Sequence, residues 1–423
     1  MKRGFYTIMA AQFFSSLADN ALFVAAVELL RASGTQEWQR AALVPMFALF
    51  YVVLAPWVGA FADARPKGQV MLASNTIKIA GCLIMLFGGH PLLAYAVVGL
   101  GAAAYSPAKY GILTELLPPS QLVKANGWIE GLTITSIILG VLLGGQLVGP
   151  RMSTYLLAMN LPGIDTAPQA AIAMLTLVYV IAAAINVRIP HTGVEMRPLP
   201  ANKMTLLPDF WRCNARLWRD KLGQISLATT TLFWGVSGNM RYIVLAWAYA
   251  ALGYATTKAA ALVGVVAVGT AVGAVMASSR VRLDRATTVM PLGVLMGALV
   301  VGMVYVDRLW IAIPFLVVMG GLGGYIVVPM NALLQHRGHN LMGAGRSIAV
   351  QNFNEQACIL ALGFLYSAST GLGLSAFGAI ALFGSVVMLS MAAIQYWYRH
   401  NLRHHTAEIK QLMRVARGKN APP

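Results

Sequence analysis

The stretch that decides the fold is Gly101-Ala-Ala-Ala-Tyr-Ser-Pro107-Ala-Lys109, because a second stretch far along the chain repeats its pattern. That second stretch is Gly323-Gly-Tyr-Ile-Val-Val-Pro329-Met-Asn331. In both, a Gly precedes a Pro by six residues, and a polar residue follows the Pro two positions later. Both lie in long apolar runs. The pattern predicts a membrane chain built from two similar halves, which is typical of transporters.

Two further correspondences support this repeat. Asp19-Asn20 follows Phe14 at the offset at which Gly238-Asn239 follows Phe233. The pair Asn126 and Glu130 likewise corresponds to a later polar run that holds Gln351 and Glu355.

The composition indicates the same class of protein. Of 423 residues, 58% are hydrophobic and 11% are charged, where a soluble protein has roughly 25% charged residues. The mean hydropathy is +0.67. The formal net charge of +17 alone would suggest a nucleic-acid partner. This chain has too little polar surface for that function, and too much apolar sequence for a soluble multidomain protein. The composition therefore predicts a polytopic membrane protein.

Apolar runs of about 20 residues, enough to cross about 30 Å of hydrocarbon, set the predicted spans. Twelve are expected, at 4–30, 41–62, 69–89, 92–115, 123–149, 168–188, 222–250, 257–278, 286–306, 310–333, 345–371 and 373–397. With this assignment, 24 Lys and Arg residues fall on one side of the membrane and 5 on the other. The positive-inside rule then predicts that both termini are cytoplasmic.

The predicted domain organisation follows from these spans. Residues 1–188 form the first six-helix half and 222–397 the second, with a basic linker at 189–221 and a basic cytoplasmic tail at 398–423. In the linker, Phe210, Trp211, Leu217 and Trp218 recur at helical spacing among three arginines. This pattern is typical of a helix lying in the headgroup region, although an ordinary solvated linker is the alternative.

Polar side chains inside the spans are the candidate functional residues, because an ionisable group in a spanning helix must face a cavity or a partner. Several of these polar side chains recur at helical spacing, which places them along one side of their span. Lys109 lies beside Tyr110 in the cytoplasmic half of the fourth predicted span. The candidate binding or gating residues are Asp19, Asn20, Lys109, Tyr110, Asn126, Glu130, Arg241, Gln351 and Glu355.

Two interpretations of the buried charges stay open. Asp19 and Arg241 lie at similar depth, so they either lock the halves together or belong to a central binding site of mixed charge. A mixed-charge site suits a zwitterion, with phosphate against the cations and an amine against Asp19 or Glu355. Lys78 has no polar stripe beside it, and we expect a structural or snorkelling role for it.

One loop and five sequence runs resemble a known family. The loop between the second and third spans, Gly59-Ala-Phe-Ala-Asp63-Ala-Arg65-Pro-Lys67-Gly68, resembles the signature loop of the major facilitator superfamily, although its spacing after Asp63 departs from the usual form. The runs around Asp19-Asn20, Gly101–Gly111, Val123–Gly127, Val328–Gln335 and Ala349–Glu355 are similar to bacterial lysophospholipid transporters of that superfamily.

The resemblance implies a twelve-helix, all-α major facilitator fold in the bacterial inner membrane. It also implies a flippase that moves lysophospholipids, chiefly lysophosphatidylethanolamine, from the outer to the inner leaflet for re-acylation. An acyltransferase/acyl-carrier-protein synthetase would be its functional partner. Buried charges of the family fall on Asp19, Arg241 and Glu355, with Lys109 on the cytoplasmic side. We expect a monomer with no cofactor, no metal and no nucleic-acid partner.

Two rival functions are kept. A proton-coupled exporter of drugs or metabolites would need a carboxylate that titrates, such as Asp19, Glu130 or Glu355. A membrane-embedded lipid enzyme is the other, but the seven histidines all lie in predicted loops or in the tail, without the carboxylate spacing of an acyltransferase. We therefore expect a transporter and not an enzyme.

Overall fold

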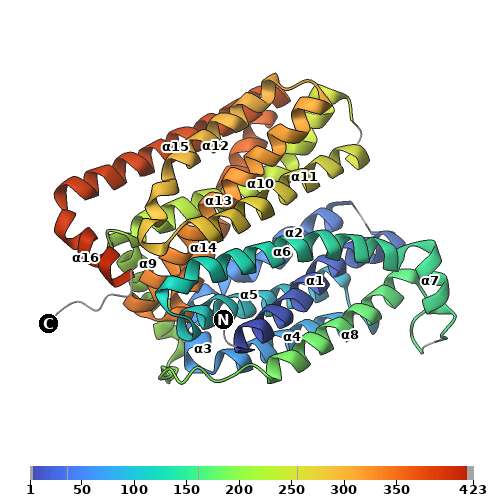
Figure 1. Cartoon of the computed structure of the whole chain (residues 1–423). Helices are drawn as coiled ribbons and strands as arrows, with labels where there is room; N and C mark the ends of the chain where they lie inside the picture. Colours follow the sequence, from blue (N-terminus) through green and yellow to red (C-terminus); the bar gives the residue numbers. More distant parts are fainter. Residues whose placement is uncertain (1–2, 36, 161, 255, 417–423) are drawn as a thin grey trace. The chain divides into compact units, whose positions relative to one another are not determined.

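A computed structural model of the chain describes residues 3–35, 37–160, 162–254 and 256–416, and these residues form helices and no strand (Figure 1). Three of the 24 basic residues that we predict on the cytoplasmic side lie outside the described residues, namely Lys2, Arg417 and Lys419. Residues 417–423, the end of the predicted tail, also lie outside them.

The first half of the chain contains eight α-helices. They are α1 (Arg3–Ala32), α2 (Glu37–Val53), α3 (Ala55–Ala64), α4 (Lys67–Leu86), α5 (Pro91–Leu116), α6 (Pro119–Val148), α7 (Pro150–Leu157) and α8 (Ala167–Val187). The predicted linker contains a short 3-10 turn, η1 (Lys203–Thr205), and the helix α9 (Leu206–Arg219).

The second half contains seven α-helices and two 3-10 segments. They are α10 (Gly223–Leu252), α11 (Thr256–Arg280), η2 (Leu283–Val289), α12 (Met290–Gly302), η3 (Met303–Tyr305), α13 (Leu309–Met342), α14 (Ala344–Gly371), α15 (Ala376–His404) and α16 (Thr406–Ala416).

Within the described residues, nine helices are long and apolar enough to cross a membrane. The helices α2 and α3 meet at a bend of 64° and make a tenth span if they are counted together. The helices α10 and α14, which carry polar residues along their length, lie over the other two predicted spans. The count of twelve and the orientation of the termini stay predictions.

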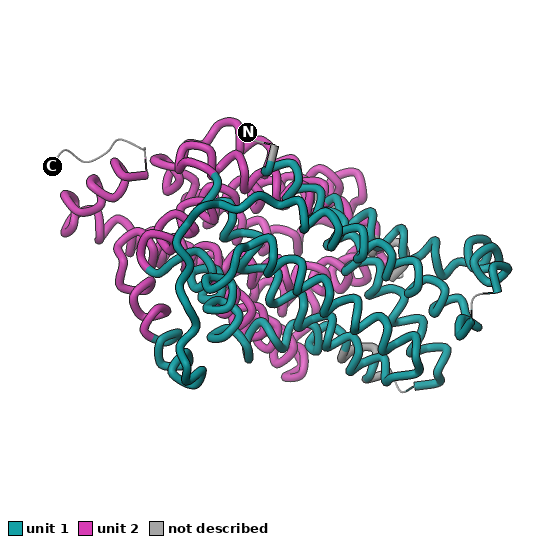
Figure 2. The backbone as a smooth tube through the Cα atoms, turned by 90° about the horizontal axis from the view of Figure 1, so that it is seen from below, with its two compact units in different colours: residues 1–116, 135–211, 342–350 teal, residues 117–134, 212–341, 351–423 magenta. Residues whose placement is uncertain are grey.

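The chain forms two compact units (Figure 2). Unit 1 comprises Met1–Leu116, Thr135–Trp211 and Met342–Val350, and unit 2 comprises Leu117–Ile134, Arg212–Leu341 and Gln351–Pro423. The first part of α6 thus belongs to unit 2, and the first turns of α14 belong to unit 1.

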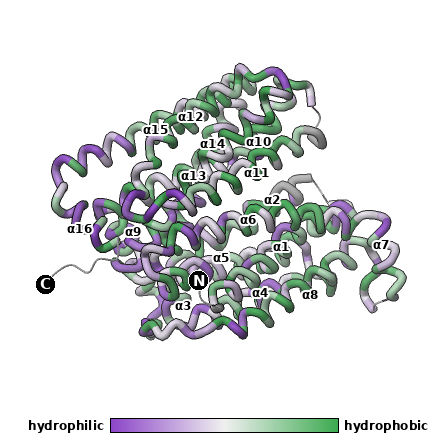
Figure 3. The backbone as a smooth tube through the Cα atoms, viewed as in Figure 1, coloured by the Kyte–Doolittle hydropathy of each residue, from purple (hydrophilic) through white to green (hydrophobic). Residues whose placement is uncertain are grey.

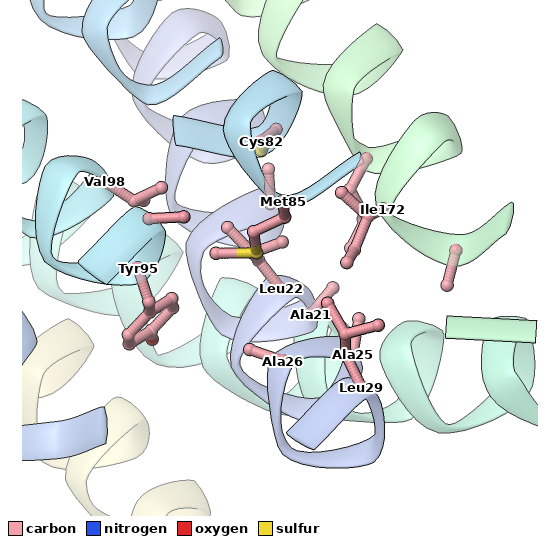
Figure 4. Close-up of a cluster of buried hydrophobic side chains, with 14 of the residues drawn as sticks. Ala21, Leu22, Ala25, Ala26, Leu29, Cys82, Met85, Tyr95, Val98 and Ile172 are labelled. Atoms are coloured by element: carbon pink, nitrogen blue, oxygen red, sulfur yellow. The ribbon is translucent and has the colours of Figure 1, made fainter. Parts of the chain in front are cut away.

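In unit 1, α4 packs along α5 and α8, and α1 packs along α8. The core between them is built from small and aliphatic side chains, among them Ala21, Leu22, Met85 and Val98 (Figure 4). Alanines dominate the buried face of α1, and their small volume lets the helices approach closely.

In unit 2, α12 and α10 pack along α15. Hydrophobic residues run along most of these helices, whereas the C-terminal end of α15 is hydrophilic and α16 is mixed (Figure 3). The helices α11 and α13 approach unusually closely. A Cβ on Gly269 would lie 2.3 Å from the Val317 carbonyl oxygen, and one on Gly273 would lie 1.9 Å from that of Gly321. Only glycine fits at these two positions, because the backbones of α11 and α13 are in direct contact there.

Candidate functional site

Unit 1 contains a buried charge pair between α1 and α4. Lys78 Nζ donates to Asp19 Oδ2 at 2.8 Å and to Ser15 Oγ at 3.0 Å. Ser15 Oγ in turn donates to Asn75 Oδ1 at 2.8 Å. Lys78 is 1% exposed, so its ammonium group is removed from water and Asp19 is its counter-ion. Such a pair tolerates burial because each charge is hydrogen-bonded.

Two tyrosines complete this network. Tyr179 of α8 donates its hydroxyl to Asp19 Oδ1 at 2.6 Å. The Lys78 ammonium also lies over the Tyr105 ring of α5, 5.0 Å from its centroid, in a cation–π arrangement. Four helices therefore converge on one Asp–Lys pair, and both oxygens of the Asp19 carboxylate have donors.

The sequence interpretation of Lys78 needs a correction. A snorkelling role is wrong, since Lys78 Nζ ends on Asp19 inside the unit. The statement that no polar stripe accompanies it is also wrong, because Ser74 and Asn75 lie one turn earlier and are fully buried. That i−4 and i−3 spacing was the available signal. The signal for Tyr179 was weaker, because Thr176 is the only polar residue three or four positions away in α8.

Unit 2 contains a second polar network, between α6, α13 and α14. Asn126 and Gln335 exchange side-chain amide hydrogen bonds in both directions, each 2.9 Å long. Asn331 Nδ2 contacts Glu130 Oε1 at 3.5 Å. Gln351 Nε2 donates to Asn331 Oδ1 at 3.0 Å and to Glu355 Oε1 at 2.7 Å. The network thus runs from one buried carboxylate to another through two amides.

Four predicted residues meet here, namely Asn126, Glu130, Gln351 and Glu355. Asn331 and Gln335 join them and were missed as site residues. The signal for Asn331 was present, because it occupies the position in the repeat that corresponds to Lys109. These α13 amides connect the candidate residues of α6 with those of α14.

The network is rich in hydrogen-bond acceptors around Glu355. In the described part of the chain, Glu355 forms no ion pair with a Lys or Arg, although it is only 8% exposed. The buried Gln351 Oε1 has no hydrogen-bond donor. A buried acceptor without a donor costs about 1–3 kcal/mol. A ligand that brings N–H donors or positive charge would offset this cost.

Arg241 lies in the same unit as Glu355, on α10. This helix packs against α14, since Asn239 Nδ2 donates to the Ile359 carbonyl oxygen at 2.9 Å and a Cβ on Gly235 would lie 2.5 Å from Cys358 Sγ. Arg241 is exposed, and among the described residues it makes no ion pair. An exposed guanidinium beside the helix that carries Glu355 is available to an anionic group.

The two remaining predicted residue pairs are placed less centrally. Asn20 donates to the Ser16 carbonyl oxygen of its own helix at 2.8 Å, next to Asp19. Lys109 Nζ lies 4.3 Å above the Tyr110 ring, and both side chains are half-buried. Neither pair joins the Lys78 network or the Glu355 network through a hydrogen bond described above.

The signature loop builds a third polar cluster, within unit 1. The Asp63 carboxylate accepts hydrogen bonds from the backbone N–H groups of Gly345 at 2.6 Å and Arg346 at 3.0 Å, in the first turn of α14. A carboxylate there complements the positive end of the helix dipole. Lys67 connects Asp63, at 3.3 Å, to Glu115, at 2.9 Å. The altered spacing after Asp63 therefore still produces a helix-capping cluster.

No group of three or more His, Cys, Asp or Glu side chains with metal-binding geometry occurs in residues 3–35, 37–160, 162–254 and 256–416. What the described site offers is charge and hydrogen bonding inside an apolar helical protein.

Comparison with known proteins assigns the class. A model of the Major Facilitator Superfamily matches residues 8–354. Two solved structures share the fold. The first is the human organic anion transporter MFSD10, with a TM-score of 0.73 and 13% identity over 93% of this chain and 100% of that one. The second is a bacterial homologue of the iron transporter ferroportin, with a TM-score of 0.68 and 14% identity over 94% of this chain and 99% of that one. The chain belongs to the Major Facilitator Superfamily and is a multi-pass membrane protein with its fold.

Within this superfamily, two similar curated proteins are lysophospholipid transporters. The lysophospholipid transporter LplT of Yersinia enterocolitica is 39% identical over 374 residues, which are 88% of this chain and 89% of the relative. That of Pectobacterium carotovorum is 39% identical over 376 residues, which are 89% and 88%. The family predicted from the sequence runs is therefore confirmed.

Proposed function

We propose that this protein is a lysophospholipid transporter, which flips lysophosphatidylethanolamine and related lysolipids from the outer to the inner leaflet of the bacterial inner membrane. The 39% identical relatives named as lysophospholipid transporters support the substrate class. The two halves would open alternately, as the internal repeat suggests. The twelve-helix topology with cytoplasmic termini, the two six-helix halves and the monomeric state are part of this proposal.

The observation that carries the proposal is the acceptor-rich network at Glu355 and Gln351. An ethanolamine ammonium group supplies the N–H donors and the positive charge that these two side chains lack. Asp19 is a weaker candidate for this role, because Lys78 already neutralises it at 2.8 Å. The structure thus favours Glu355 over Asp19 as the amine-binding carboxylate.

Arg241 is the proposed phosphate-binding residue. Its guanidinium is exposed, and a planar guanidinium binds phosphate oxygens in a bidentate manner. Arg241 and Glu355 belong to one unit, so a zwitterionic headgroup would have both charges recognised by that unit. Lys109 and Tyr110 are proposed to contact the headgroup on the cytoplasmic side, where it leaves.

After transport, the lysolipid would be re-acylated by an acyltransferase/acyl-carrier-protein synthetase in the same membrane. The transporter itself would make or break no covalent bond and would need no cofactor. Incubating purified protein with labelled lysolipid tests this point, since any covalent product would identify an enzyme.

The decisive experiment is a leaflet-resolved flipping assay in proteoliposomes. Fluorescent lysophosphatidylethanolamine is added outside, and a membrane-impermeant quencher measures the fraction that has crossed. We expect the wild-type protein to transport it, and Arg241→Ala and Glu355→Gln to lose most of the uptake while still inserting into the membrane. Near-normal flipping by both variants would contradict the assigned site.

The same assay separates the rival transporter. Because Glu130 and Glu355 lie in one buried network, a proton-coupled exporter remains the second candidate. Transport that ignores lysolipid and collapses with an uncoupler would favour the exporter. Flipping that is unchanged without a gradient would favour the flippase.

A further inference from the structure

The helix α9 buries one face and exposes the other. Leu206, Phe210, Cys213 and Leu217 recur at helical spacing and are all buried. Arg212, Arg216 and Arg219 lie on the opposite side and are all exposed. Because they are spaced at i, i+4 and i+7, the three guanidinium groups project from one face of the helix. We name these three residues the arginine face.

Among the described residues, no acidic side chain forms an ion pair with the arginine face, whereas Arg337 and Arg346 each pair with an aspartate. Trp211 lies at the edge of this face and is 50% exposed, and Leu207, which lies further round the helix, is 38% exposed. The exposed surface of α9 therefore combines three cations with a neighbouring aromatic and a neighbouring aliphatic side chain.

We propose that the arginine face of α9 binds the anionic phospholipid headgroups of the membrane surface. Guanidinium groups bind phosphate oxygens through paired hydrogen bonds, and an anionic leaflet attracts basic segments close to it. Tryptophan is enriched at the boundary between headgroups and hydrocarbon, since its ring is apolar and its N–H is polar. An acidic protein surface would match the charges but would give the exposed Trp211 and Leu207 no apolar phase.

The other side of α9 is fixed to unit 2, which keeps the arginine face rigid. Trp218 Nε1 donates to Asn354 Oδ1 at 3.2 Å, and Asn354 donates to Asn214 at 2.8 Å. Trp218 also stacks on Trp397 of α15 with an interplanar angle of 6°. Because α9 is already fixed in place, it loses little conformational entropy when it binds headgroups, and its affinity is not reduced by that cost.

The anchor also lies next to the proposed substrate site. Asn354, which holds α9, directly precedes Glu355 in α14. If the protein transports lysolipid as proposed above, headgroup binding on α9 has a direct mechanical connection to the helix that carries Glu355. Lipid binding itself does not rest on that proposed function, and it is measured separately.

The test is native mass spectrometry of the full-length protein in detergent, titrated with phosphatidylglycerol or phosphatidylcholine. Each basic residue near an anionic surface contributes about a fivefold factor to binding, so Arg212→Gln/Arg216→Gln/Arg219→Gln should bind phosphatidylglycerol about a hundredfold more weakly. The binding of phosphatidylcholine should change little. The corresponding triple lysine variant should keep most of the phosphatidylglycerol binding.

A matched control uses the other short amphipathic helix. Lys410 and Arg414 of α16 are also exposed, but the acidic Glu408 is exposed on the same helix and no tryptophan accompanies them. Lys410→Gln/Arg414→Gln should therefore weaken phosphatidylglycerol binding much less than the triple glutamine variant does. Unchanged binding in the triple glutamine variant, or an equal loss in the α16 control, would overturn the proposal. So would a triple variant that loses affinity for a polyglutamate peptide but not for the lipid, since the arginine face would then serve an acidic protein. Lysolipid flipping by the triple variant is measured in parallel, and its outcome bears on the transport function alone.

Discussion

Two carboxylates in this protein, the half-buried Asp19 and the buried Glu355, have opposite surroundings. Asp19 in unit 1 accepts from the ammonium of Lys78 and the hydroxyl of Tyr179, so both its oxygens have donors. Glu355 in unit 2 accepts from the neutral amide of Gln351, and it forms no ion pair with a basic residue among those described. One carboxylate is neutralised by its own unit, and the other is not.

The difference indicates separate roles for the two networks. Inside a membrane protein, an uncompensated charge is expensive and is retained where function requires it. The Asp19–Lys78 pair has the features of an element that holds four helices together. The Glu355 network keeps unused acceptors, which is what a site for a cationic group needs. We therefore propose that the same residue chemistry supports structure in one unit and binding in the other.

The strongest way to break this comparison is to remove the cation of unit 1. Lys78→Met should lower the free energy of unfolding by about 3 kcal/mol, because it leaves the half-buried Asp19 carboxylate beside Tyr179 without its counter-ion. Denaturation of the purified protein in mixed micelles measures the loss.

The control for this prediction is the double variant Asp19→Asn/Lys78→Met, which removes both charges. It should recover most of the lost stability, because no uncompensated charge is left. If Lys78→Met alone unfolds at the wild-type denaturant concentration, the pair does not hold unit 1 together and the contrast with Glu355 disappears.

The matching change in unit 2 should act on transport rather than on stability. Glu355→Gln keeps an oxygen that accepts from Gln351 but removes the charge, so transport of lysophosphatidylethanolamine should fall about tenfold to a hundredfold, as expected for the loss of one charge-assisted contact. The free energy of unfolding should stay within about 1 kcal/mol of wild type. A large stability loss with normal flipping would reverse the roles of the two networks.

Much of this arrangement could be predicted from the sequence. The stripes Asn126–Glu130 and Gln351–Glu355 each follow the i, i+4 period of a helix, which places both members on one side of it. Apolar length gave helices at every predicted span, and the repeated Gly–Pro–polar pattern identified Asn331 as a counterpart of Lys109. Local periodicity therefore found the correct helices and most of unit 2's polar residues.

The partners could not be predicted, because they depend on which helices become neighbours. Asp19 and Arg241 seemed comparable by depth alone, whereas the structure pairs Asp19 with Lys78, from α4, and with Tyr179, from α8. Tyr179 has Thr176 one turn earlier in α8, but nothing in that helix indicates Asp19 as its partner. Polar contacts between helices far apart in the chain are set by packing, which a single helical period does not encode.

The stem of Lys78 gives a subtler way to test unit 1. A Cβ on Gly101 of α5 would lie 2.7 Å from Lys78 Cγ and 2.7 Å from the Ser74 carbonyl oxygen. Gly101→Ala should therefore push α5 from α4, shift Lys78 and cost about 1 kcal/mol of unfolding free energy. Gly145→Ala, where nothing lies within 4 Å of the added Cβ, is the matched control and should be neutral or stabilising. Equal effects of the two changes would mean that Lys78 is not held by this contact.

The smallest expected effect concerns the neutral part of the unit 2 network. Asn126 and Gln335 exchange two hydrogen bonds, yet amide pairs between membrane helices are coupled by only about 0.6 kcal/mol on average. A double-mutant cycle with Asn126→Ala and Gln335→Ala should give a coupling energy of that order. A small coupling energy would mean that these amides contribute little to the stability of unit 2, so its network could rearrange around a ligand. Unit 1, held by the Asp19–Lys78 pair, would differ from it in this respect. A coupling energy of about 3 kcal/mol or more would instead equal a buried ion pair, and unit 2 would be held as firmly as unit 1.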